Sequence, residues 1–94
     1  MIVKVFIRRN IPPGKVPELA PLMKQLRMLA ISQHGYISGE TLKDVDTHQD
    51  YITISTWHSM SDWKNFEKMA ERKALVDKIE TILSQKSQYI AYSY

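Results

Sequence analysis

The chain has 94 residues, of which 44% are hydrophobic and 24% are charged, and it contains no cysteine. Domains mostly span about 50 to 250 residues, so we expect residues 1–94 to form a single domain. Without cysteine, disulfides, thiolate metal ligands and thiol nucleophiles are excluded. The sequence shows neither a signal-peptide pattern nor the ~20 consecutive apolar residues of a membrane span, which predicts a cytoplasmic protein with no membrane partner.

The charge is mildly positive and evenly distributed. Thirteen Lys and Arg residues against ten Asp and Glu residues give a net charge of +3 at pH 7. The basic residues are spread from Lys4 to Lys86, with acidic residues between them. Nucleic-acid-binding domains instead cluster lysine and arginine on one face or along one helix. The pattern is typical of an ordinary solvated surface, and no nucleic-acid partner is expected.

The first predicted element is a β-strand over residues 2–9, which are mainly β-branched, aromatic or basic. Alternation along this strand places Val3, Val5 and Ile7 on one face. The Pro12-Pro13-Gly14 sequence then ends the strand, because proline donates no hydrogen bond to a sheet and Pro-Gly favours a turn.

A helix is predicted to follow from Val16, because apolar residues recur every three or four positions as far as Ala30. Pro21 lies inside this pattern and removes a backbone hydrogen bond, so we expect a kink or a later start of the helix. Gly35 is expected to end the helix as the left-handed residue that follows its last turn.

Two further strands are predicted over residues 36–45 and 51–58. The second is the clearer, since β-branched and aromatic residues dominate it. Residues 46–50 between the strands are polar and suit a hairpin connection. The two strands are therefore expected to pair with each other.

The last part of the chain is predicted to contain helix and then strand. Ser59 and Asp62 have the spacing of a capping box, which marks a helix start. No Gly or Pro follows until Lys86, but the apolar spacing changes phase at residues 70–73, which leaves one helix or two as alternatives. Residues 89–94 have the composition of a C-terminal strand.

The resulting order, β-α-β-β-α-β, predicts an α+β ferredoxin-like fold with a four-stranded antiparallel sheet and helices on one face. In the third strand, Thr53, Ser55 and Trp57 point to one side, and Ile52 and Ile54 point to the other. Helices cover only one side of such a sheet, so apolar residues on the other side indicate an interface. We expect a two-fold homodimer through the open sheet face.

A ligand pocket is predicted where the third strand faces the helices. Small hydroxyl residues at this position leave space, and their hydroxyl groups need hydrogen-bond partners. Substrate-binding residues are expected to be Thr53, Ser55, Trp57, Trp63 and Phe66. The alternative for the three aromatic residues is packing in the hydrophobic core, which is the commoner use of such side chains.

The three histidines do not indicate a metal site. His34, His48 and His58 fall at a helix end, in a loop and at a strand end, and no two of them have metal-ligand spacing. The sequence also lacks phosphate-binding glycine loops, nucleophile elbows and zinc-protease motifs. We therefore expect no metal, and no catalytic residue is assigned.

Several segments resemble the antibiotic biosynthesis monooxygenase (ABM) domain family. They are Pro-Gly-Lys at 13–15, Gly-Tyr-Ile-Ser-Gly-Glu-Thr-Leu at 35–42, Tyr-Ile-Thr-Ile-Ser-Thr-Trp at 51–57 and Ser-Asp-Trp at 61–63. The resemblance extends over nearly the whole chain. It implies the family's fold, a ferredoxin-like dimeric α+β barrel, which agrees with the element order and the two-faced sheet.

The resemblance also implies an activity, a monooxygenase that acts without a bound cofactor on a small electron-rich aromatic substrate such as a phenol or quinol. Cofactor-free members carry Asn and Trp on the third strand and Tyr at the start of the next helix. This sequence has Thr53, Trp57 and Trp63 there, so only the tryptophan is kept. The haem-degrading branch carries Trp and a haem-ligating His, where this chain has Phe66 and Val76.

Fold alone does not determine activity, so a second hypothesis stays open. Other enzymatic branches of the family carry a histidine in the second helical region, and residues 59–94 contain none. The alternative is a non-catalytic dimeric α+β barrel that binds a small apolar ligand or has a structural or regulatory role. An elongated cavity beside Trp57 would favour the enzyme, and a filled core there would favour the alternative.

Overall fold

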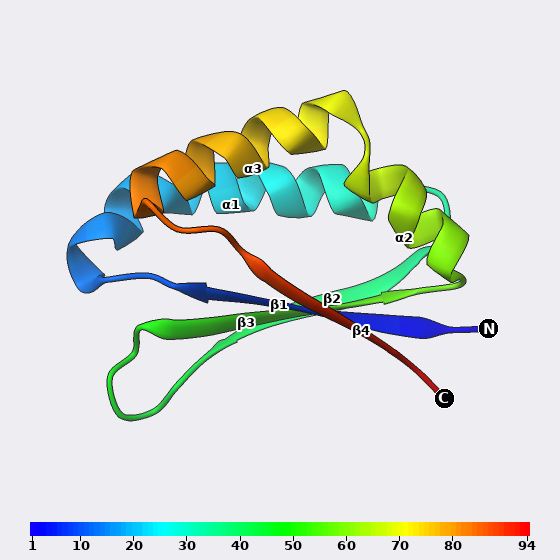
Figure 1. Ribbon diagram of the computed structural model, residues 1–94, viewed down its shortest axis with the longest axis horizontal. Helices are drawn as coiled ribbons and strands as arrows, with labels where there is room; N and C mark the ends of the chain where they lie inside the picture. Colours follow the sequence, from blue (N-terminus) through cyan, green and yellow to red (C-terminus); the bar gives the residue numbers. More distant parts are fainter.

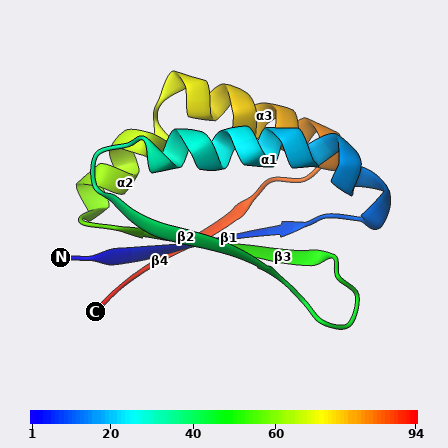
Figure 2. The ribbon, with the colours of Figure 1, turned by 180° about the vertical axis from the view of Figure 1, so that it is seen from behind.

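Four strands form one antiparallel sheet in the order β2-β3-β1-β4, and three α-helices lie on one of its faces (Figure 1). The computed structural model describes residues 1–94. Its elements are β1 (Val3–Asn10), a short 3-10 helix η1 (Pro13–Lys15), α1 (Val16–Ile31), β2 (Tyr36–Lys43), β3 (Asp50–Trp57), α2 (Met60–Glu67), α3 (Ala70–Leu83) and β4 (Gln88–Ser93). Seen from behind, α1 and α3 again lie side by side along the sheet (Figure 2). The predicted ferredoxin-like α+β fold is confirmed.

The central strand β1 determines which side chains face the helices. It pairs antiparallel with β3 and β4, and Val5 lies opposite both Ser55 and Ala91. Directly opposed residues share one side of a sheet, so the alternation predicted for the first and third strands is confirmed. The helix-facing residues of these two strands are Val3, Val5, Ile7 and Arg9 of β1 and Tyr51, Thr53, Ser55 and Trp57 of β3.

The hydrophobic core lies between this side of the sheet and the helices, in two clusters. The larger cluster contains Val3, Val5, Ile7, Trp57, Trp63 and Phe66. The smaller cluster contains Ile11, Leu19 and Ile79. Each cluster joins residues of β1 or the segment after it to residues of the helices, so apolar burial holds the helices on the sheet.

The opposite side of the sheet carries no helix (Figures 1 and 2). We call it the uncovered face and define it by its apolar residues, which are Phe6, Leu42, Ile52, Ile54, Ile90 and Tyr92. The rings of Phe6 and Tyr92 pack edge to face, with their centroids 5.2 Å apart. Leu42, Ile90 and Tyr92 each stay more than half exposed. The apolar second side of the sheet is therefore present.

Helix α1 begins where the apolar spacing predicts and ends earlier than expected. It begins at Val16 and continues past Pro21, so the later start is wrong. Proline removes only one hydrogen bond here, and its fixed φ suits a helix. The helix ends at Ile31, with Ser32 as its cap, although Gly35 does adopt φ +85°. Gly35 is therefore not the residue that ends the helix; it turns the chain into β2, where a Cβ would overlap Asp62.

The second helical region consists of two helices, which settles the alternative left by the sequence. Ser59 caps α2, because its Oγ accepts a hydrogen bond from the Asp62 backbone N–H at 3.1 Å. Met69 then adopts an extended conformation before α3 begins. The phase change in the apolar pattern lies at this break, so α2 and α3 each bury their own stripe. No helix of the chain has the length and apolar character that crossing a bilayer requires.

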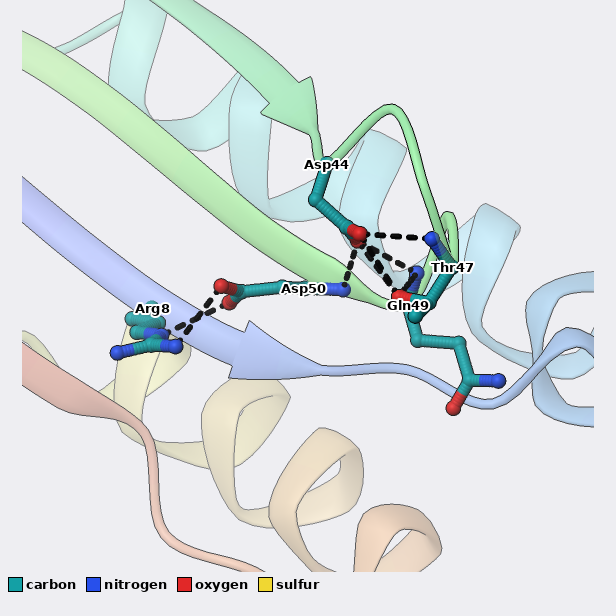
Figure 3. A network of polar contacts seen from close by, with 5 residues as sticks. All are labelled: Arg8, Asp44, Thr47, Gln49 and Asp50. Carbon is teal, nitrogen blue, oxygen red and sulfur yellow. Dashed lines mark hydrogen bonds and ion pairs between the residues drawn. The ribbon is translucent and has the colours of Figure 1, made fainter.

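The loop between β2 and β3 is organised around Asp44 (Figure 3). Its carboxylate accepts hydrogen bonds from the backbone N–H groups of Thr47, Gln49 and Asp50 at 2.8 to 3.0 Å, and from the Thr47 hydroxyl. These bonds, led by those from Thr47 and Asp50, hold the pKa of the Asp44 carboxyl well below its usual range. Nearby, Arg8 makes a two-point ion pair with Asp50, with both N–O distances 2.8 Å.

Replacing Asp44 with asparagine is expected to lower the thermal midpoint of unfolding at pH 7, because an amide cannot accept all of these bonds. The lowered pKa means that the carboxylate stabilises the fold fully above the unfolded-state pKa, about 3.9, and progressively less as the pH falls below it. The gap between the thermal midpoints of wild type and Asp44→Asn should therefore narrow as the pH falls from about 4 toward 2, as measured by circular dichroism. Asp46→Asn is the matched control, since Asp46 is an exposed loop carboxylate without this network. A gap that is equal at pH 7 and pH 3 would contradict the role assigned to the ionised carboxylate.

Candidate functional site

A cavity of about 370 Å³ lies between the helix-facing side of the sheet and the helices. Its wall is mainly apolar, and α1 contributes Leu19, Met23, Leu26 and Ala30 to it. Strands β1, β2 and β3 supply the floor, and residues of α2 and α3 close one side. We call this space the helix-side cavity. Ligand pockets mostly span ~300 to 1,000 Å³, so its size suits a small ligand.

All five residues predicted to bind substrate border the helix-side cavity. Thr53, Ser55 and Trp57 come from β3, and Trp63 and Phe66 come from α2. The strand alternation places the first three on the correct side of the sheet, and the capped helix α2 folds back over them. The structure therefore brings the set together, while its role in binding stays a prediction.

Trp57 belongs both to the core and to the cavity wall. Its side chain is completely buried, and its ring stacks on Phe66 with centroids 5.3 Å apart and meets Trp63 at 5.8 Å. The indole Nε1–H donates a hydrogen bond to Ser55 Oγ at 3.0 Å. The three aromatic residues therefore pack in the hydrophobic core and also border the cavity, so the core supports the cavity wall.

The hydroxyl groups facing the cavity already have protein partners. Thr53 Oγ1 lies 3.1 Å from Thr41 Oγ1 on the neighbouring strand β2, and either hydroxyl can donate. Ser55 Oγ accepts from Trp57 and keeps its own proton free to donate. Both groups can therefore still offer one hydrogen bond to a ligand oxygen.

Two arginines of the cavity wall were not anticipated from the sequence. Arg9 on β1 and Arg72 on α3 line the cavity, and each is only 4% exposed. The sequence did indicate the position of Arg9, because strand alternation places it on the same side of the sheet as Val3, Val5 and Ile7. For Arg72, its position four residues before Val76 places it on the buried side of α3.

The two arginines are held by polar and aromatic neighbours. Arg9 Nε donates to Ser87 Oγ at 2.9 Å, and Arg72 Nη2 donates to Tyr89 Oη at 2.8 Å. The Arg72 guanidinium also lies over the Trp63 ring, 5.1 Å from its centroid, and over Phe66 and Tyr89 at 5.5 Å. Such cation–π contacts fix the guanidinium between the aromatic rings.

The histidines do not converge on a site. His34 is exposed, and its Nε2 lies 3.9 Å from Asp62 Oδ1, a distance typical of a weak surface contact. His48 lies in the β2–β3 loop and His58 follows β3, and both are exposed. No group of three His, Cys, Asp or Glu side chains is arranged to hold a metal ion.

The fold and the site together define a ferredoxin-like α+β domain, with a ligand-sized apolar cavity on one side of its sheet and an uncovered apolar face on the other. A sequence model of one family, described as antibiotic biosynthesis monooxygenase, matches residues 2–78. The chain therefore belongs to the antibiotic biosynthesis monooxygenase family. Among curated proteins, none matches the chain in sequence.

Solved structures share the fold at low sequence identity. A conserved protein from Methanosarcina mazei Go1 superposes with a TM-score of 0.89 at 15% identity, covering 98% of this chain and 91% of that chain. A mutant of SnoaB from Streptomyces nogalater, described as a cofactor-independent oxygenase, superposes with a TM-score of 0.87 at 13% identity. The match covers 99% of this chain and 92% of that chain. Rv0793 from Mycobacterium tuberculosis gives 0.86 at 12% identity, covering 100% and 95%. These similarities support the fold of the whole chain.

Proposed function

We propose that the protein is a cofactor-independent monooxygenase that oxidises a small electron-rich aromatic substrate, a phenol or quinol, in the helix-side cavity. The observation that carries the proposal is the mainly apolar cavity of about 370 Å³ bordered by Trp57 and Trp63, in a chain of the antibiotic biosynthesis monooxygenase family. SnoaB, which is described as a cofactor-independent oxygenase, shares the fold and supports the same reaction class.

The reaction would depend on the substrate's own reactivity. The aromatic ring packs against the apolar wall that the buried Trp57 supports, while the Thr53 hydroxyl donates a hydrogen bond to a ring oxygen. Loss of the phenolic proton gives an electron-rich anion that reduces O2, and a hydroperoxide then forms at the ring carbon para to that oxygen. Where this carbon carries hydrogen, loss of water from the hydroperoxide leaves a quinone, so that one phenol and one O2 give one quinone and one H2O. A quinol already carries oxygen at this carbon, and one quinol and one O2 give one quinone and one H2O2. The apolar wall excludes bulk water from the anion.

The proposal is tested by O2 consumption with a dithranol-like or menadiol-like substrate, after the spontaneous rate without protein is subtracted. Thr53→Val keeps the shape of the side chain but removes its hydroxyl, so the catalysed rate is expected to fall roughly 2- to 10-fold, the value of one hydrogen bond. Thr81→Val is the control, because Thr81 is exposed on α3 away from the cavity. An unchanged rate in Thr53→Val would count against Thr53 as the group that orients the substrate.

We also propose that residues 1–94 act as one domain of a homodimeric α+β barrel, in which the uncovered face of one copy packs on that of a second. A two-fold interface must be self-complementary. The uncovered face meets this requirement, because its apolar residues are flanked by Arg8 and Asp50, which provide both signs of charge. The dimer would cover the exposed side chains of Leu42, Ile90 and Tyr92.

A second candidate function, a non-catalytic barrel that binds a small apolar ligand, is favoured by the hydroxyl groups of the cavity. Ser55 already bonds with Trp57, and Thr53 already bonds with Thr41. No histidine or carboxylate stands among the predicted binding residues to act as a general base. This function would be supported if aromatic ligands bind in the cavity without O2 consumption above the spontaneous rate.

A further inference from the structure

Arg9 and Arg72 form a pair of buried cations without a carboxylate partner. None of the five ion pairs in the structure includes either residue. Arg72 Nη1 donates to the Glu67 backbone carbonyl, and the other polar contacts of the two guanidinium groups are hydroxyls. Buried charges are normally paired, because removing an unpaired charge from water is highly unfavourable.

Each guanidinium also has an unused donor. Arg9 Nη2 and Arg72 Nε are buried nitrogen atoms with no hydrogen-bond partner. Both residues border the helix-side cavity. Most buried side-chain polar atoms in proteins are hydrogen-bonded, so two orphaned donors beside one cavity point to a partner that enters the cavity from outside.

The two guanidinium groups bond to Ser87 and Tyr89, which are two residues apart in the chain. Burial, the largest cause, lowers the pKa of the Arg9 guanidinium; the positive charge of Arg72 acts in the same direction, and Tyr89 and Glu80 oppose it. Glu80 makes no ion pair with either arginine; its carboxylate accepts the Ser87 backbone N–H at 2.7 Å and lies 3.7 Å from Lys86. An arginine stays protonated in proteins, so the positive charge remains in the site.

The remaining lining of the cavity adds to the positive charge. Lys24 and Arg27 of α1 also border it, whereas the only acidic residue of the lining is Glu40 of β2. Four basic residues and one acidic residue therefore border the cavity, and Glu40 lies opposite Ile54, whose side chain belongs to the uncovered face, although the chain as a whole is nearly balanced in charge. Charged walls around a cleft concentrate ligands of the opposite sign.

We propose that the helix-side cavity selects an aromatic carboxylate, whose ring packs against the apolar wall and whose carboxylate binds Arg9 and Arg72. A carboxylate has two oxygen atoms, which matches two orphaned donors on two guanidinium groups. A phenolate has one oxygen atom and would leave one donor unused. The inference rests on the proposed function and narrows its substrate class to hydroxylated aromatic acids.

The test is calorimetric binding of 2-naphthoate, 2-naphthamide and 2-naphthol to the full chain at pH 7. The acid and the amide have nearly the same shape and differ in charge. 2-Naphthoate is expected to bind at least about 10-fold more tightly than 2-naphthamide, the size expected for hydrogen bonds to a charged group. Equal affinity for the acid and the amide, tighter binding of 2-naphthol, or no binding of any of the three would overturn the proposal.

The variants Arg9→Gln and Arg72→Gln test whether these two arginines cause the preference for 2-naphthoate over 2-naphthamide. Each is expected to weaken binding of 2-naphthoate about 10-fold or more and to change binding of 2-naphthamide by less than about threefold. Lys73→Gln is the matched control, because it removes the same charge from the neighbouring, exposed position of α3. Selectivity retained in both arginine variants, or lost in Lys73→Gln, would mean that the two arginines do not recognise the acid.

The thermal midpoint of unfolding, measured without ligand, distinguishes a purely structural role of Arg9 from a role in binding. Arg9→Met keeps the length of the side chain and removes its buried charge, so its thermal midpoint is expected to equal or exceed that of the wild type. A marked fall in the midpoint would assign Arg9 to the fold and overturn its role in binding. If 2-naphthoate binds selectively and no phenol stimulates O2 consumption, the carboxylate site stands and the monooxygenase proposal fails.

Discussion

Replacing Trp57 with alanine is expected to lower the free energy of unfolding by about 3 to 5 kcal/mol, the usual effect of truncating a fully buried large aromatic residue. Trp57 is 0% exposed and contacts the rings of Tyr36, Trp63 and Phe66. The substitution removes these contacts, leaves a void at the meeting point of β3 and α2, and takes away the hydrogen bond to Ser55. Urea unfolding followed by far-UV circular dichroism measures the change.

Met28→Ala is the control for this prediction. Met28 is also a large apolar residue, but it is 59% exposed on α1, so its truncation is expected to change stability by less than ~0.5 kcal/mol. Trp57→Phe separates packing from the hydrogen bond, because it keeps an aromatic ring and loses the indole N–H. A loss below about 1 kcal/mol in Trp57→Ala, which is far below the range for core aromatics, would mean that the aromatic cluster does not support the cavity wall.

Replacing Ile90 with aspartate is expected to convert the proposed homodimer to monomers, raising its dissociation constant on the order of 100-fold or more. Ile90 lies on the uncovered face, opposite Phe6, and is 56% exposed in the single chain. Two-fold symmetry would bring two new carboxylates into one apolar interface, which adds desolvation and repulsion. Sedimentation equilibrium over a range of protein concentrations measures the shift.

Met28→Asp is the matched control, since Met28 has nearly the same exposure as Ile90 but lies on the opposite layer of the molecule. It should leave the sedimentation behaviour of the wild type unchanged. Leu42→Lys, on the edge strand β2, changes the same face and should also weaken association. It provides a second test if the Ile90 variant does not fold. A wild-type chain that sediments as a monomer at all concentrations would exclude the homodimer.

Local sequence patterns were sufficient for the sheet and insufficient at the C-terminal end of α1. Alternation is a strict geometric property of strands, so the sides occupied by Val5, Ser55 and Trp57 follow directly from sequence spacing. The end of α1 does not follow from one residue type. Gly35 has the backbone conformation expected of a helix-ending glycine, but the helix ends at Ile31, and Gly35 lies beside Asp62, a residue far away in sequence.

The candidate site was predictable where its residues are apolar or carry hydroxyl groups, and its two buried arginines were missed. The aromatic residues fall at strand and helix spacings that identify their buried sides, and all five predicted residues border the cavity. Arg9 and Arg72 fall at equally informative positions, but arginine is normally a surface residue. Their burial requires Ser87 and Tyr89 from the end of the chain, which no local pattern links to β1 or α3.

The Asp44 loop has a consequence for the identity of the cavity. By fixing the length of the connection, its hydrogen bonds keep Lys43 opposite Tyr51 and Thr41 opposite Thr53. Side chains alternate along a strand, so a slip of β3 by a single residue would turn Trp57 toward solvent and isoleucines toward the helices. A loop at the far end of the hairpin therefore acts as a register lock, and the chemical character of the cavity depends on an exposed carboxylate that never touches it.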